Sequence, residues 1–318
     1  MPDSILLVQL GSPKSAEPCD VKKYLIDFLG DPHTLGSPPF FWNPLLKYVI
    51  APVRSKASAA KYRKMLESSR MSEMPLIAHT RAFAAGVGEL LTHRMHVAFA
   101  FEYGSSPSIG EALDLLVSQG AKKIRVISLY PQRSDVTTGA AEALVREAAK
   151  KRPGLELEFM QGFSRKKVWI NAIADSIRRF WNGKDKILLS FHGVQQKRID
   201  AGDPYFLDVQ ESANAIGEII GVKPIVSFQS RFGFVKWLEP STEDVLKKMG
   251  HDRGSVLIAC PAFTVDNLET LYEVDVELKG KFFSWGGTSF VRIPCLNADP
   301  LWIRSFAEEI AAEENIEV

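Results

Sequence analysis

The chain has 318 residues, enough for two ordinary domains or one large one. Its hydrophobic content of 46% is that of a soluble globular protein, and a formal net charge of +1 argues against nucleic acid as a partner. Cys19, Cys260 and Cys295 are far apart and form no C-x-x-C pair, which argues against a disulfide framework, a zinc ribbon or a cysteine-rich iron–sulfur site. Residues 1–13 lack the features of a signal peptide, and no apolar run is long enough to span a membrane, so we expect a cytoplasmic protein.

Short apolar segments alternate with helical patterns in the first half of the chain. Residues 4–9 (SILLVQ) predict a buried strand that ends at a Gly-Ser-Pro turn. The other predicted strands here are residues 96–101, 123–129 and 155–159, and the predicted helices are residues 21–29, 55–67, 80–92, 108–119 and 140–151.

Residues 35–53 (LGSPPFFWNPLLKYVIAPV) are rich in proline and aromatic residues. Two interpretations stand. The segment is either a packed connection between helices or a flexible lip that meets an apolar ligand or a membrane surface.

The same alternation repeats in the second half of the chain. The predicted strands are residues 186–191, 224–228, 255–260 and 290–293, and the predicted helices are residues 167–181, 209–220, 242–249 and 300–312. Short apolar strands separated by helices predict parallel sheets covered on both faces. We therefore predict an α/β fold of two similar Rossmann-like, doubly wound domains, residues 1–160 and 161–299, with the helix at residues 300–313 packing back on the first.

Ligands of doubly wound sheets bind where the strands end, so these loops hold the candidate site residues. His192 follows strand 186–191, either as a base or metal ligand or as a structural histidine. After strand 123–129, Ser134 and Thr138 precede a helix, as an anion-binding turn or a simple N-cap. No G-x-G-x-x-G, G-x-x-x-x-G-K-[ST] or G-x-S-x-G motif follows any predicted strand, which argues against dinucleotide, triphosphate or serine-nucleophile chemistry.

An acidic stripe follows the predicted strand at residues 255–260. Glu269, Glu273 and Glu277 recur every four residues, so on a helix they share one face, with Asp266 about a turn earlier. Like charges at this spacing repel by about 0.2–0.5 kcal/mol per pair. The stripe is either a solvated helix face or a carboxylate track that holds a hard cation or relays protons.

Nine segments occur in a fixed order over nearly the whole chain. They are LLVQLGSP (6–13), VKKYLIDFLGDP (21–32), YGSSPSI (103–109), LYPQRSDVTTG (129–139), SFHG (190–193), GDPY (202–205), SRFGFVKWLEPST (230–242), CPAFTVDNLETLYEVD (260–275) and RIPCLN (292–297). Together they resemble the ferrochelatase family, whose members insert Fe²⁺ into a porphyrin to make haem.

The resemblance implies the chelatase fold, with a cleft between two Rossmann-like halves, and implies His192 and Glu269 as catalytic residues on opposite sides of the reaction centre. Metallation removes two pyrrole protons, and a neutral imidazole at His192 can accept a proton or ligate iron. Carboxylates bind Fe²⁺ less tightly than thiolates, so Glu269 and Glu273 are predicted metal ligands together with His192. Asp266, Glu273 and Glu277 are predicted to relay protons or metal, on a helix that the family widens into a π-turn.

The resemblance also implies a set of substrate-binding residues: Leu10, Tyr103, Arg133, Ser134, Thr138 and Trp237. Leu10 and residues 24–32 resemble members that act on protoporphyrin, because coproporphyrin enzymes carry Tyr in place of Leu10. We therefore expect protoporphyrin IX and Fe²⁺ as substrates and residues 35–53 as a lip that also contacts a membrane surface. We expect no iron–sulfur cluster, since no cysteine follows Cys295.

Three positions depart from the family pattern. Asn267 stands where mammalian members have a histidine, Glu102 stands where an arginine is usual, and Arg133 stands where a tyrosine is usual. We hypothesise that Arg133 replaces the cation lost at Glu102 and pairs with the propionates of the substrate.

Two other functions are compatible with these residues. One is a cobalt or nickel chelatase acting on a related tetrapyrrole, although such enzymes usually carry more histidine ligands. The other is a non-catalytic porphyrin- or haem-binding paralogue, which the departures at Glu102 and Arg133 favour and the presence of both His192 and Glu269 disfavours.

Overall fold

The chain divides into two compact units in a computed structural model that describes residues 2–35, 41–91, 94–231, 233 and 235–314. Unit 1 comprises residues 1–130, 134–162 and 298–318, and unit 2 comprises residues 131–133 and 163–297. The main division falls at residue 162, where the sequence predicts it near residue 160, and the C-terminal helix belongs to unit 1. The predicted cleft between the domains stays a prediction.

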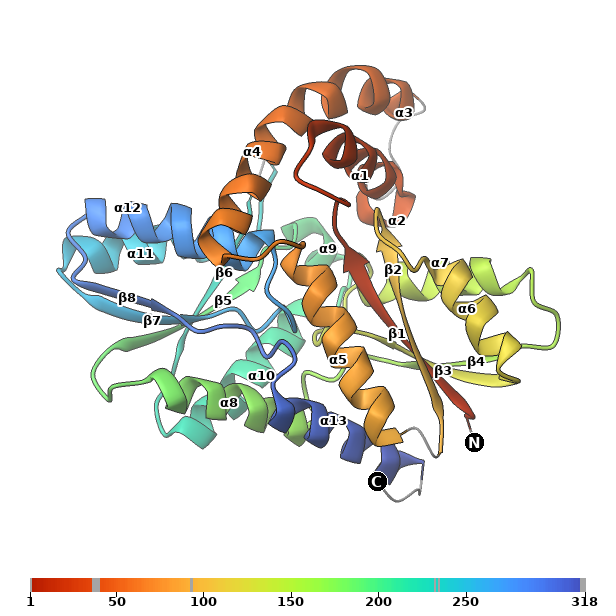
Figure 1. Cartoon of the computed structure of the whole chain (residues 1–318). Coiled ribbons are helices and arrows are strands. Elements are labelled where there is room, and N and C mark those ends of the chain that lie inside the picture. The colour runs from red at the N-terminus through yellow and green to blue at the C-terminus, as the bar shows by residue number, and fades with distance from the viewer. Residues whose placement is uncertain (1, 36–40, 92–93, 232, 234, 315–318) are drawn as a thin grey trace. The chain divides into compact units, whose positions relative to one another are not determined.

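Unit 1 is built on a parallel sheet of four described strands in the order β2-β1-β3-β4 (Figure 1). The strands are β1 (Ser4–Gly11), β2 (His96–Tyr103), β3 (Lys123–Ser128) and β4 (Glu156–Met160). The helices are α1 (Pro18–Gly30), α2 (Pro32–Leu35), α3 (Trp42–Leu45), the π-helix η1 (Leu46–Ile50), α4 (Ala51–Ser69), α5 (Pro75–Leu91), α6 (Ile109–Ser118), α7 (Thr138–Ala149) and α13 (Pro300–Glu313).

The core of unit 1 explains why β1 is an uninterrupted apolar run. The side chains at residues 5–8 are fully buried, so this strand is covered on both faces, as expected for a central parallel strand. Leu6 and Val8 pack in one cluster with residues of α6 and α7. Helix α13 packs on α5, where Trp302 stacks on Phe83 with 5.8 Å between the ring centroids.

The proline-rich segment is mostly helical rather than irregular. It forms α3, η1 and the start of α4 (Figure 1), and residues 36–40 lie outside the described residues. Pro52 is the second residue of α4, which continues η1 without a break, and as a proline it has no N–H to donate to the preceding turn. One side of the segment is packed, with Leu46 buried against Leu29 of α1, whereas Tyr48 and Val53 are 71% and 72% exposed.

Unit 2 has the same strand order, β6-β5-β7-β8, again with all four described strands parallel. The strands are β5 (Lys186–His192), β6 (Ile225–Gln229), β7 (Ser255–Ala259) and β8 (Ser289–Arg292). The helices are α8 (Lys167–Phe180), α9 (Gln196–Asp200), α10 (Tyr205–Ile220), α11 (Thr242–His251), the π-helix η2 (Glu269–Leu278) and α12 (Lys279–Ser284).

The core of unit 2 fixes the orientation of η2. Val274 and Leu278 of this helix pack in one cluster with Val256 and Ile258 of β7 and with residues of α11 and α12. Every predicted strand is present, and the predicted α/β class with two doubly wound parallel sheets is confirmed. The short helices α9 and α12 and the extension of α5 back to Pro75 were not predicted. Among the described residues, no helix is both long and apolar enough to cross a bilayer.

Candidate functional site

His192 is the last residue of β5, at the carboxyl edge of the sheet, by which we mean the side where its parallel strands end. The following Gly193 donates its backbone N–H to the carbonyl oxygen of Gln229 at 2.8 Å. A Cβ atom at position 193 would lie 2.7 Å from that oxygen, so only glycine allows β5 and β6 to approach this closely. Gly193 therefore fixes the end of β5 and, with it, the position of the His192 side chain.

The hydrogen bonds of His192 determine its tautomer. Its Nδ1 lies 2.8 Å from the carbonyl oxygen of Gly193, and a carbonyl can only accept, so Nδ1 carries the proton. Burial lowers the pKa of His192, while the negative charge of Glu273 acts in the opposite direction. The ring is therefore neutral at pH 7, with the lone pair on Nε2 free to accept a proton or bind a metal.

Tyr205 supports the backbone of His192 from the start of α10. Its hydroxyl donates to the carbonyl oxygen of His192 at 2.8 Å, and Asp203 accepts the backbone N–H of Tyr205 at 2.9 Å. These residues belong to the GDPY segment at 202–205, which sequence reasoning marked without giving it a role. The segment holds the strand end that carries the imidazole.

Glu273 is held in place by a strained residue. Ser230, which follows β6, donates its hydroxyl to Glu273 Oε2 at 2.6 Å. Its backbone φ of 62° lies in the left-handed region that residues other than glycine rarely occupy. Such strain persists where surrounding contacts enforce it, often at functional sites. No sequence signal identified Ser230 as a partner of Glu273, because 43 positions separate them.

The acidic stripe lies on η2, and the predicted π-helix is confirmed. Asn267 lies two residues before this helix, and its side-chain oxygen accepts the backbone N–H of Thr270 at 3.1 Å. Glu269, Glu273 and Glu277 are all partly exposed, and each directly precedes a residue of the buried stripe at 270, 274 and 278. A π-helix has a wider turn than an α-helix, so residues four apart stay closer to one line along it.

The three glutamates have different surroundings. Glu273 is close enough to His192 to influence its pKa, whereas Glu277 forms an ion pair with Lys281 at 3.3 Å. Glu269 occupies the first turn of η2. Among the residues that the structure describes, no group of three or more His, Cys, Asp or Glu side chains is arranged to hold a metal ion.

Asp266 lies in a buried network instead of on the exposed stripe. Its Oδ1 pairs with Arg292 Nη1 at 2.7 Å and accepts the hydroxyl of Thr270 at 2.9 Å, while its Oδ2 accepts Asn297 Nδ2 at 2.9 Å. These partners outweigh burial and lower the pKa of Asp266. With both oxygens engaged, this carboxylate joins the start of η2 to β8 and has no lone pair turned toward the exposed glutamates that a relay would require.

Arg133 also has an internal partner. Its Nε and Nη2 donate to the two carboxylate oxygens of Asp208 at 2.9 and 2.7 Å, a bidentate ion pair, and Arg165 donates to the same carboxylate. The Asp208 side chain is 1% exposed. Binding a propionate would require Arg133 to share or leave this pair, so the arrangement gives no support to the hypothesis that Arg133 replaces a lost cation.

The carboxyl edge of unit 1 carries a second group of polar side chains. Glu102, next to last in β2, accepts the hydroxyl of Tyr130 at 2.8 Å, and Tyr103 donates its hydroxyl to Asp31 at 2.9 Å. Burial, with the negative charge of Asp31 in the same direction, raises the pKa of Glu102 to about 8 despite the Tyr130 bond. Glu102 is therefore largely a neutral carboxylic acid at pH 7, unlike any arginine at this position.

The remaining predicted substrate residues lie at the strand ends of their own units. Leu10 is partly exposed near the end of β1. Thr138 donates its hydroxyl to the carbonyl oxygen of Ser134 at 3.0 Å, a local bond that closes the turn before α7. Trp237 is buried in unit 2 beside Gly193. The predicted substrate roles of these residues stay predictions.

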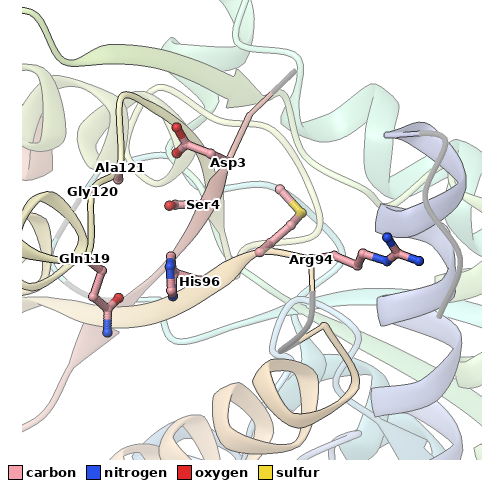
Figure 2. A pocket seen from close by; sticks show the side chains of 8 residues that line it. Asp3, Ser4, Arg94, His96, Gln119, Gly120 and Ala121 are labelled. Atoms are coloured by element: carbon pink, nitrogen blue, oxygen red, sulfur yellow. The ribbon is translucent and has the colours of Figure 1, made fainter.

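A separate cavity of about 270 Å³ opens at the opposite edge of the unit 1 sheet. Figure 2 shows Ser4 and His96, the first residues of β1 and β2, beside Asp3 and Gln119. No predicted site residue lines it. The strand starts that form it are far along the sheet from the ends that carry the candidate chemistry.

Comparison with known proteins places this geometry in a family. The model of the Ferrochelatase family matches residues 2–314. Among solved structures, SirB from Bacillus subtilis with Fe³⁺ is similar at a TM-score of 0.61 and 13% identity, covering 100% of this chain and 99% of that one. The sirohydrochlorin chelatase SirB from Bacillus subtilis subspecies spizizenii, in complex with cobalt, gives 0.57 and 13%, covering 99% and 97%. CbiX, the terminal enzyme of sirohaem biosynthesis in denitrifying bacteria, gives 0.52 and 14%, covering 97% and 98%. At these identities the structural likeness shows the fold alone.

Proposed function

Because this chain belongs to the ferrochelatase family and is a metal chelatase of tetrapyrroles, we propose that it inserts Fe²⁺ into protoporphyrin IX. The observation that carries the proposal is the state of His192. Its Nδ1–H is committed to the Gly193 carbonyl, its ring is neutral, and Nε2 keeps a lone pair. A porphyrin must lose two pyrrole protons to bind a divalent metal, and this nitrogen can accept one of them.

Glu273 supports the same step from η2. When Nε2 takes a proton the ring becomes an imidazolium, and the nearby carboxylate stabilises that positive charge. The Ser230 hydroxyl holds the carboxylate in place, so little reorganisation is needed when the charge appears. The proton then passes first to Glu273 and next to Glu277, along the part-exposed face of η2.

Fe²⁺ is a substrate in this scheme. Glu269 and Glu273 are the proposed donors, and His192 would serve as a ligand only before its Nε2 lone pair takes up the pyrrole proton. Carboxylate oxygens suit a metal that must be released to the four ring nitrogens, because they bind Fe²⁺ less tightly than thiolates do. The buried Cys260 and the partly exposed Cys295 take no part, since desolvation raises the pKa of both thiols and keeps them protonated.

The choice of protoporphyrin rests on Leu10 and on the family resemblance of residues 24–32. Leu10 presents an apolar, partly exposed side chain near the end of β1, which suits the apolar periphery of this porphyrin. A second candidate is insertion of Co²⁺ into a sirohydrochlorin-like tetrapyrrole, which the fold of SirB in complex with cobalt favours. That class of substrate carries many more carboxylates than protoporphyrin.

An anaerobic insertion assay separates these candidates and the non-catalytic alternative. Purified protein is given Fe²⁺ or Co²⁺ with protoporphyrin IX or sirohydrochlorin, and the absorbance of the metallated product is followed. We expect the highest kcat/KM for Fe²⁺ with protoporphyrin IX. Turnover of sirohydrochlorin alone would support the second candidate, and tight binding without turnover would support the paralogue.

We also propose that the exposed side of η1 and the first turn of α4 rests on a lipid surface. Tyr48, Val49 and Val53 are 71%, 53% and 72% exposed, and exposed apolar side chains that gather on one segment favour an interfacial contact. Sedimentation with phosphatidylcholine–phosphatidylglycerol vesicles tests this contact. Y48S/V53S should lower the bound fraction, and an equal bound fraction in the double variant would refute the proposal.

A further inference from the structure

Two carboxyl groups lie near each other at the carboxyl edge of the unit 1 sheet. Glu102 is on β2, and Asp31 directly follows α1. Each is held by a tyrosine hydroxyl, Tyr130 to Glu102 at 2.8 Å and Tyr103 to Asp31 at 2.9 Å. The negative charge of Asp31 contributes to the raised pKa of Glu102, so the two groups are within electrostatic range.

Neither carboxyl group forms an ion pair with Lys, Arg or His in the described part of the chain. Asp31 takes its second hydrogen bond from the backbone N–H of His33 at 2.7 Å. Both tyrosine hydroxyl protons are used within the group, so neither is available to a ligand carboxylate. Among the described residues, neither Glu102 nor Asp31 therefore brings a paired cation that could also meet an anionic substituent.

The surroundings of the pair are aromatic. Phe28 stacks on Tyr24 with 5.8 Å between ring centroids and meets Tyr103 edge-on at 5.6 Å. A methyl or vinyl group placed at this edge meets apolar ring surface. A ligand carboxylate placed beside Glu102 and Asp31 would lose its hydration and would face the negative charge of Asp31. Because Asp31 has no ion-pair partner among the described residues, binding such a carboxylate would cost free energy.

We propose that Glu102 and Asp31 are specificity-determining residues that exclude tetrapyrroles carrying an additional carboxylate at this edge. The inference rests on the proposed function and adds a charge-based reason for choosing a dicarboxylate porphyrin. Exclusion of an unwanted ligand by an unpaired like charge is an established route to specificity. Ionisation of Glu102 at about pH 8 adds a second negative charge beside Asp31, Tyr24, Tyr103 and Tyr130, so the exclusion strengthens above that pH.

The test measures equilibrium binding of two metal-free porphyrins by fluorescence. Protoporphyrin IX carries two carboxylates and coproporphyrin III carries four. We expect wild type to favour protoporphyrin, and E102R to shift the ratio of the two Kd values about tenfold toward coproporphyrin, since a close charge pair replaces a like-charge contact. E102Q should match wild type at pH 7 and shift the ratio about threefold at pH 9, where only wild type gains charge.

The matched control is E156R, which makes the same charge change at the exposed start of β4, on the opposite edge of the same sheet. It should leave the ratio unchanged. Because arginine is larger than glutamate, the nearly isosteric E102Q provides the second test at a partly buried position. If wild type, E102R and E102Q had the same ratio of the two Kd values at pH 9, this inference would be overturned while the proposed function would stand. Failure of wild type to bind either porphyrin would overturn the proposed function and this inference with it.

Discussion

The two sheets share one strand order, so each strand end in unit 1 has a counterpart in unit 2. At the edge of unit 2, burial lowers the pKa of the His192 imidazole and keeps it neutral, while the nearby Glu273 carboxylate opposes that shift. At the edge of unit 1, a carboxyl group lies within range of another carboxylate, and the pair resists loss of a proton. Sheets of the same strand order thus carry an unprotonated imidazole in unit 2 and a carboxyl group that keeps its proton in unit 1.

The difference lies in the few residues that end the strands. The charge of Glu273 favours the protonated imidazole of His192, whereas the charge of Asp31 favours the protonated, neutral form of Glu102. We therefore expect activity to depend on the strand-end side chains rather than on the sheets that position them. The following substitutions test this comparison, beginning with the largest expected effect.

Replacing the base of unit 2 should have the largest effect. H192A removes the proton acceptor, and general-base catalysis is worth about 10²–10⁴-fold, so we expect kcat for Fe²⁺ insertion to fall about 10³-fold. The measurement is the initial rate under anaerobic conditions. H251A, on an exposed histidine at the end of α11, is the control and should retain wild-type activity. A rate for H192A within threefold of wild type would remove His192 from the mechanism.

Breaking the buried pair that anchors η2 should change stability more than catalysis. D266N removes the buried, closer one of the two carboxylates that pair with Arg292, and loss of one member of a buried ion pair costs about 3–5 kcal/mol of the free energy of unfolding. Urea denaturation measures the loss. Because the pKa of Asp266 is lowered in the folded protein, its stabilising effect is present above the ordinary carboxylate pKa and disappears as pH falls. The difference in free energy of unfolding between wild type and D266N should therefore narrow below about pH 4.

The control for D266N is D275N, because the part-exposed Asp275 contacts the same Arg292 at 3.3 Å. That contact should be worth less than about 1 kcal/mol. If D266N kept wild-type stability but lost insertion activity, Asp266 would belong to the relay after all.

Removing the charge of unit 1 should stabilise the protein at alkaline pH. The folded pKa of Glu102 is about 8 and its ordinary value is 4.5, so the unfolded chain gives up this proton first and wild-type stability falls as pH rises between those values. E102Q does not ionise and should be more stable than wild type by about 2 kcal/mol at pH 9, roughly half of what the full shift from 4.5 to about 8 would give, because Glu102 is partly exposed. The two proteins should converge near pH 4. Thermal melts between pH 4 and pH 9 measure this. If the difference in stability between E102Q and wild type did not grow with pH, the raised pKa of Glu102 would be wrong.

Changing the strained serine should have the smallest effect. S230A removes the hydroxyl that holds Glu273, and we expect KM for Fe²⁺ to rise about fivefold, in line with about 1 kcal/mol for such a bond. S230G makes the same deletion but relieves the positive φ, so it should share the kinetic defect and be about 1 kcal/mol more stable than S230A. Wild-type KM in S230G would mean that the hydroxyl does not position Glu273.

The sequence was informative where one local pattern determines the outcome. Apolar runs such as residues 4–9 predicted strands buried on both faces, and His192 was found because it follows one of these runs directly. The spacing of Glu269, Glu273 and Glu277 gave their shared helix face without any tertiary information.

The sequence was uninformative where a side chain's partner lies far along the chain. Arg133 was assigned to substrate propionates, but Asp208, 75 positions later, occupies its guanidinium. Asp266 was grouped with the stripe, yet Arg292 on β8 draws it into the core. The unusual acid at Glu102 was noticed as a departure, but its raised pKa depends on burial and on Asp31, which sequence alone does not bring together.

The most direct test of the central claim is the protonation state of His192. Nitrogen-15 NMR of the protein labelled at histidine, assigned by comparison with H192A, reports the proton on each ring nitrogen. We predict a neutral ring at pH 7 with the proton on Nδ1 and an unprotonated Nε2. A proton on Nε2, or a positively charged ring at pH 7, would leave no acceptor for the pyrrole proton and would rule out His192 as the base.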